Sequence, residues 1–174
     1  MGGGGPKDRK LISVVFVLVV IVLVVIAYSV FQNLTGKNYS SYLSLVAKQT
    51  ELARIADIGA NKARTGSVKN YAATIRAISQ SEKAETIAFL KKKNQKITEK
   101  ALLASKDTAT DKSLALAEQT SNYDEKFIST INSLVLEYQK SVKSLPTTGL
   151  TKSEKKLVLD LQTDAKVIAN LSTK

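Results

Sequence analysis

The pattern of apolar and polar side chains changes sharply along the chain. Val, Ile, Leu and Phe fill 17 of the 21 positions from Leu11 to Phe31, and none of the 21 residues is charged. At about 1.5 Å rise per residue, a helix of this length spans roughly 30 Å, the thickness of the hydrocarbon core of a bilayer. The pattern therefore predicts one transmembrane helix over residues 11–31.

The charges that flank this segment predict its orientation. Residues 1–10 form a basic tail, in which Lys7, Arg9 and Lys10 directly precede the apolar run. The positive-inside rule then leaves the N-terminus in the cytoplasm and exports everything after Phe31. The alternative is a cleaved signal peptide, but its apolar core usually spans only 7 to 15 residues. We therefore expect an uncleaved signal-anchor in the cell membrane, with the lipid bilayer as a partner.

Helical periodicity replaces the apolar run after residue 38. Residues 32–38 contain Gly36 and predict a short stalk, and residues 39–174 show apolar positions at three- and four-residue steps. These positions predict helices over about 41–64, 67–93, 114–144 and 151–171, with a short apolar piece at 97–104 and a polar break at 105–113. The predicted fold is all-α: an N-terminal transmembrane helix followed by an antiparallel four-helix bundle.

Two residue types are missing, and their absence limits the chemistry. The chain has no cysteine, which excludes disulfides, thiolate metal sites and thiol nucleophiles. It also has no histidine, the usual general base at neutral pH and the commonest transition-metal ligand. No phosphate-binding glycine-rich loop is present either. We expect no enzymatic activity, no catalytic residue and no cofactor.

The predicted bundle is basic. After Phe31 the chain has 23 basic and 14 acidic residues, a net charge of +9. The densest basic cluster comprises Lys91, Lys92, Lys93, Lys96 and Lys100. It is interpreted either as a helix end whose cations complement the helix dipole or as a docking patch for an anionic polymer or lipid. Because no aromatic residues are interleaved with these lysines, sequence-specific nucleic-acid binding is not expected.

Several carboxylates fall near the predicted seams between helices: Glu51, Asp57, Glu82, Asp124 and Asp164. Di-iron sites in helical bundles use Glu-x-x-His pairs, which a chain without histidine cannot supply. An all-carboxylate site is the alternative to partly solvated polar positions. We predict the latter and therefore no metal site.

Two stretches resemble a known family. The first stretch comprises Glu51-Leu52-Ala53, Ala60, Ala63, the segment 67–72 and Phe89-Leu90-Lys91. It resembles the first helical hairpin of a ferritin-like four-helix domain of unknown function, found in bacterial envelope proteins. The segment 123–128 is similar to the aromatic-Asp-x-x-aromatic motif that opens the third long helix of that family. The resemblance extends from Tyr39 to Leu171 and implies the bundle topology. It implies no metal function, because the histidines that the family places near Ser81, Glu82 and Leu134 are missing.

These observations favour a non-enzymatic display module. We expect a membrane-anchored, extracytoplasmic bundle that binds an anionic envelope polymer or a partner protein. The alternative is a structural subunit of a membrane or cell-surface assembly, which would associate through its transmembrane helix and the small side chains of its first bundle helix.

Overall fold

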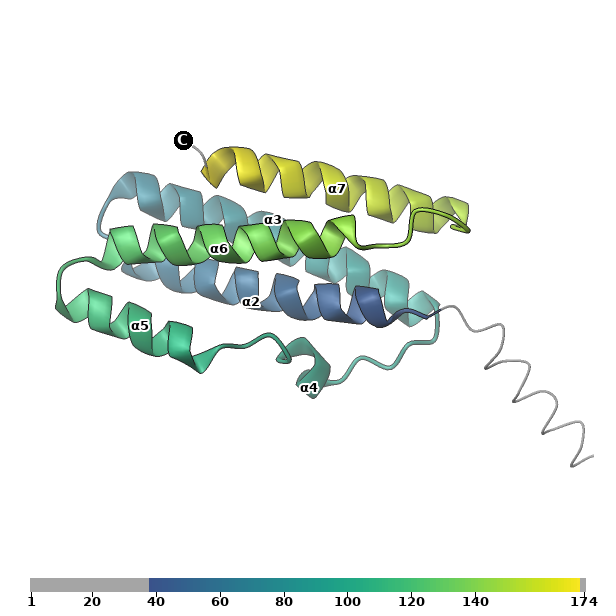
Figure 1. Ribbon diagram of the computed structural model, residues 1–174, viewed down its shortest axis with the longest axis horizontal. Coiled ribbons are helices and arrows are strands. Elements are labelled where there is room, and N and C mark those ends of the chain that lie inside the picture. The colour runs from purple at the N-terminus through teal and green to yellow at the C-terminus, as the bar shows by residue number, and fades with distance from the viewer. Residues whose placement is uncertain (1–37, 173–174) are drawn as a thin grey trace, which may run out of the picture. The chain divides into compact units, whose positions relative to one another are not determined.

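Six helices make up residues 38–172, the part of the chain that the computed structural model describes (Figure 1). They are α2 (Ser40–Lys62), α3 (Gly66–Lys92), α4 (Glu99–Leu102), α5 (Thr108–Gln119), α6 (Tyr123–Lys143) and α7 (Lys152–Ser172). The chain divides into two units, Met1–Asn38 and Tyr39–Lys174, and all six helices belong to the second. The described residues contain no strand, so the all-α prediction is confirmed for them.

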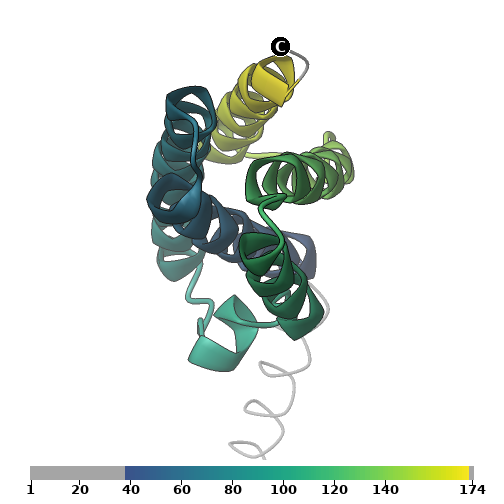
Figure 2. The same ribbon diagram turned by 90° about the vertical axis from the view of Figure 1, so that its left-hand side faces the viewer.

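The four long helices form a bundle in which every neighbouring pair is antiparallel. α2 packs against α3 and α6, and α7 packs against the same two helices (Figure 1). α3 and α6 therefore lie diagonally opposite and run in the same direction. The chain connects them by a crossover that contains α4 and α5, and α5 lies outside the four-helix core, against α6 (Figure 2).

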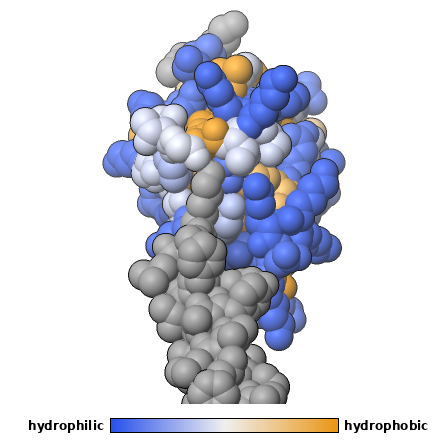
Figure 3. All heavy atoms as spheres, turned by 90° about the vertical axis from the view of Figure 1, so that its right-hand side faces the viewer, coloured by the Kyte–Doolittle hydropathy of each residue, from blue (hydrophilic) through white to orange (hydrophobic). Residues whose placement is uncertain are grey.

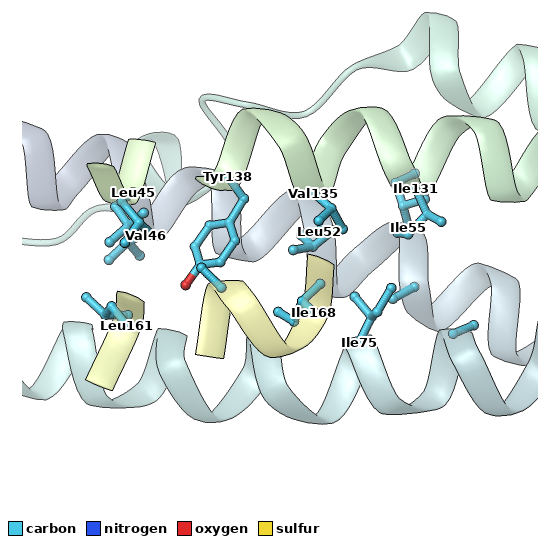
Figure 4. Packing of buried hydrophobic residues seen from close by; sticks show 14 of the residues in the cluster. Leu45, Val46, Leu52, Ile55, Ile75, Ile131, Val135, Tyr138, Leu161 and Ile168 are labelled. Atoms are coloured by element: carbon cyan, nitrogen blue, oxygen red, sulfur yellow. The ribbon is translucent and has the colours of Figure 1, made fainter. Parts of the chain in front are cut away.

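Small side chains near the C-terminal end of α2 allow close packing against the start of α6. Ala56, Gly59 and Ala63 are buried, and a Cβ on Gly59 would lie 2.1 Å from a ring carbon of Phe127. The ring of Phe127 therefore occupies the space that a larger residue would fill. Around this contact the core consists mainly of aliphatic side chains from the four long helices (Figure 4).

Helix ends explain where the predicted boundaries hold and where they fail. The predicted capping box opens α7: the backbone N–H of Thr151 donates to Glu154 Oε2 at 2.6 Å, and the Glu154 N–H donates to Thr151 Oγ1 at 3.4 Å. The predicted helix over 114–144, in contrast, is wrong, because the chain breaks between α5 and α6. Ser121 has φ 64° and the Asn122 N–H donates to the Ala117 carbonyl, the geometry of a Schellman motif.

The predicted transmembrane helix is not part of the observed fold. Within residues 38–172, no helix is both long enough and apolar enough to cross a membrane. The long helices are amphipathic, and charged residues such as Asp57 on α2 and Lys140 on α6 occupy their exposed faces. The fold class of a single-pass membrane protein with an N-terminal transmembrane helix is therefore corrected to an all-helical domain. The segment Leu11–Phe31 and its flanking Lys7, Arg9 and Lys10 lie outside the described residues.

The contact between Gly59 and Phe127 predicts opposite effects for two glycine substitutions. Gly59→Ala introduces a Cβ into the Phe127 ring and should lower the free energy of unfolding by about 1–3 kcal/mol, despite the better helix propensity of alanine. Gly66→Ala is the matched control, because a Cβ there has no neighbour within 4 Å. That variant should be neutral or stabilised by up to about 1 kcal/mol. Urea unfolding of both variants checks this, and equal stabilities would contradict the packing described.

Candidate functional site

The lysine cluster predicted from the sequence lies mainly at the C-terminal end of α3. Lys91 and Lys92 are exposed in the last turn of this helix, and Lys96 is exposed in the loop that follows. Asn94 has φ 56°, and the Gln95 N–H donates to the Leu90 carbonyl at 3.0 Å, so a Schellman motif fixes the path of this loop. The fifth predicted lysine, Lys100, is exposed on α4, which packs against α2.

Lys93 differs from the other four lysines because its ammonium group has partners within the domain. Its Nζ lies 3.6 Å from Glu154 Oε1 and 5.5 Å from the centre of the Phe89 ring. Only about a quarter of the Lys93 side chain is exposed. Its contacts join the end of α3 to the start of α7, which is a structural role. Lys91, Lys92, Lys96 and Lys100, in contrast, form no ion pair with another residue of the described range.

Glu154 is the buried carboxylate at the centre of this end of the bundle. Its residue is 1% exposed, so its charge requires internal partners. Besides Lys93, the hydroxyl of Tyr39 donates to Oε1 at 3.2 Å, and the Thr151 hydroxyl donates to Oε2 at 2.8 Å. The two hydroxyl donors and the ammonium group come from residues at the start of α2, at the start of α7 and at the end of α3. Glu154 thus holds three segments of the bundle together.

This arrangement brings a second group of lysines to the same end of the bundle as the first. Lys152 and Lys155 are exposed in the first turn of α7, on either side of Glu154 in the sequence. Polar and charged side chains cover much of the surface on the side where α3 ends and α7 begins (Figure 3). We call Lys91, Lys92, Lys96, Lys152 and Lys155 the basic end. Sequence reasoning missed the α7 members, because 59 positions separate Lys93 from Lys152.

A buried polar cluster lies inside the core. The Tyr138 side chain extends from α6 into the core (Figure 4), where its hydroxyl donates to Glu82 Oε1 of α3. Nearby, Gln49 Nε2 of α2 donates to Thr86 Oγ1 at 3.4 Å. Burial raises the pKa of Glu82 to about 8, an effect that Asp164 and Glu85 increase and the Tyr138 hydrogen bond opposes. Glu82 is therefore protonated at neutral pH.

Two of the other predicted seam carboxylates, Glu51 and Asp124, serve structural roles. Glu51 accepts two hydrogen bonds of 2.7 Å from Arg54, which also binds Asp111 at 2.6 Å and so connects α2 to α5. Asp124 accepts from the backbone N–H groups of Arg64 and Thr65, in the turn between α2 and α3. No group of three or more carboxylates in the described range is placed to hold a metal ion.

The buried carboxyl of Glu82 predicts how stability depends on pH. The folded protein keeps a proton that the unfolded chain releases between about pH 4.5 and 8, so the free energy of unfolding should fall as the pH rises through this window. The limiting slope is about 1.4 kcal/mol per pH unit. Glu82→Gln keeps a hydrogen-bond acceptor for Tyr138 and removes the titrating group.

We therefore expect Glu82→Gln to remove this slope and to be more stable than the parent protein at pH 8, by at least about 2 kcal/mol. Urea unfolding at several pH values measures the effect. Glu125→Gln, at an exposed position in the first turn of α6, is the matched control and should keep the slope, because Glu125 does not contribute to the pKa shift of Glu82. Parallel curves for the parent protein and Glu82→Gln would show that Glu82 is ionised in the fold.

Comparison with known proteins identifies no relative. No family model, no curated protein and no solved structure matches the chain. The resemblance to a ferritin-like envelope domain therefore stays a prediction based on its motifs. The function has to be argued from the geometry of the basic end and of the buried cluster alone.

Proposed function

We propose that this domain is a non-enzymatic binding module that attaches to an anionic polymer through the lysines at the end of α3. The observation that carries the proposal is the exposure of Lys91, Lys92 and Lys96 on a well-defined helix end, without an ion pair to any described residue. Cations without intramolecular partners are available to bind an external anion. The chain offers no histidine or cysteine for catalysis at neutral pH, which supports binding over turnover.

The geometry of the α3 end favours a defined site over a diffuse basic surface. The Schellman motif fixes the direction of the chain after Lys92, and the contacts of Lys93 with Glu154 and Phe89 attach this turn to the bundle. The three exposed lysines therefore project from a rigid scaffold. A ligand that binds them loses less free energy to ordering of the protein than one that binds lysines on a mobile loop.

A triple substitution tests this function. Lys91→Ala, Lys92→Ala and Lys96→Ala together should weaken binding of the full chain to polyphosphate and to polyglutamate by at least roughly 10-fold at about 0.1 M salt, because three cationic contacts are lost. The logarithm of the binding constant should also depend less steeply on the logarithm of the salt concentration, by about 2 units of slope. Fluorescence anisotropy with labelled polymers measures both quantities.

The control removes the same charge elsewhere. Lys69, Lys112 and Lys126 are exposed on α3, α5 and α6, away from the end of α3, and none pairs with a described residue. Their triple alanine variant has the same net charge as the first and should bind within about twofold of the parent protein, because only the overall field changes. Equal losses in the two variants, or no loss in the first, would refute a localised site.

A further inference from the structure

The first turn of α7 carries lysines that helix stability does not explain. Lys91 and Lys92 lie at the C-terminus of α3, where cations interact favourably with the helix dipole. Lys152 and Lys155 lie at the N-terminus of α7, where the same dipole repels them. The helix dipole therefore explains the positions of Lys91 and Lys92 but disfavours those of Lys152 and Lys155. Glu154, between them in the sequence, is directed inward and buried.

Contacts around Glu154 place these two groups of lysines at the same end of the bundle. The 3.6 Å ion pair between Lys93 and Glu154 joins the residue that follows Lys92 to the helical turn that contains Lys152 and Lys155. α3 and α7 also pack against each other as neighbouring helices of the bundle. The lysines of both helix ends thus belong to one surface of the bundle.

We propose that Lys152 and Lys155 complete the site formed by Lys91, Lys92 and Lys96, and that its ligand is a flexible linear phosphate polymer lying across both helix ends. This inference rests on the proposed function and names its ligand class. A single phosphate can neutralise one group of lysines only. A polymer with closely spaced charges can contact both groups at once, and each additional contact releases a further counterion.

The residue types of the basic end favour phosphate. Arginine recognises planar carboxylates by paired hydrogen bonds, whereas lysine binds phosphate as a point charge without a fixed geometry. Arg54, Arg64 and Arg76 all bond to other groups of the domain, and none belongs to the basic end. In the described range no tyrosine or phenylalanine is exposed, so the surface offers no platform for stacking of nucleic-acid bases.

The test is a pair of double variants of the full chain. Lys152→Ala with Lys155→Ala should weaken binding to polyphosphate roughly 10- to 30-fold at about 0.1 M salt and reduce the salt slope by about 1.5. Lys69→Ala with Lys126→Ala, at exposed positions in the first turns of α3 and α6, is the control and should bind within about twofold of the parent protein. Circular dichroism should show both variants folded, because removing cations from the start of α7 does not destabilise it.

Four outcomes decide the inference. A loss confined to the α7 variant, together with tighter binding of polyphosphate than of polyglutamate with the same number of charges, supports it. Normal polyphosphate binding by the α7 variant overturns it. The proposed function is then tested separately, by the triple variant of Lys91, Lys92 and Lys96. Preferential binding of single-stranded DNA over polyphosphate of equal phosphate number overturns it in favour of base contacts. Binding only to vesicles with anionic lipids overturns it in favour of a lipid surface.

Discussion

The buried carboxylate of Glu154 is the interaction on which the functional end of this bundle depends. A carboxylate that is 1% exposed is costly to desolvate, and it is stable there only because it has several donors. Tyr39 and Thr151 donate hydrogen bonds to it and Lys93 forms an ion pair with it, and these three residues belong to three different helix ends. The charge therefore fixes where α3 ends relative to where α7 begins, and this relation determines the surface that the exposed lysines form.

The same carboxylate explains how α7 tolerates lysines in its first turn. Lys152 and Lys155 oppose the dipole of their helix, whereas Glu154 complements it and also closes the capping box with Thr151. One inward carboxylate thus offsets the electrostatic cost of two outward cations. Lys93 is also directed inward, where it forms an ion pair with Glu154. The contacts of Glu154 therefore stabilise this end of the bundle and leave the other lysines on its surface.

The interior has a second polar feature, which the basic end does not need. Burial keeps Glu82 protonated; its Oε1 accepts from Tyr138, while its other carboxyl oxygen has no hydrogen-bond partner. A buried group of this kind lowers stability, and we find no contact between it and the lysines. Elsewhere in the domain, Gly59 packs against Phe127, and Arg54 attaches α5 to α2.

Much of the helical pattern could be predicted from the sequence, because apolar spacing and caps are local signals. Thr151 and Glu154 located the start of α7, and Gly66 lies where the turn into α3 was expected. The break between α5 and α6 was missed because Ser121 adopts a left-handed conformation that serine rarely takes.

The candidate site was predictable only in part. The run of lysines is visible in the sequence. The ion pair that gives Lys93 a structural role, and that joins the end of α3 to the start of α7, connects residues about 60 positions apart. The membrane-spanning helix, which the hydropathy of residues 11–31 predicted, is not among the helices of the described domain.

The central claim is that one end of the bundle, formed by α3 and α7, binds a phosphate polymer. Titration of the isotope-labelled full chain with polyphosphate, followed by amide chemical shifts in NMR spectra, tests it most directly. The account predicts that shifts concentrate at residues 91–96 and 151–156, and that the turns at 63–66 and 120–123 do not change. Shifts confined to one of the two helix ends, centred on the opposite end of the bundle, or spread evenly over all lysines would contradict it.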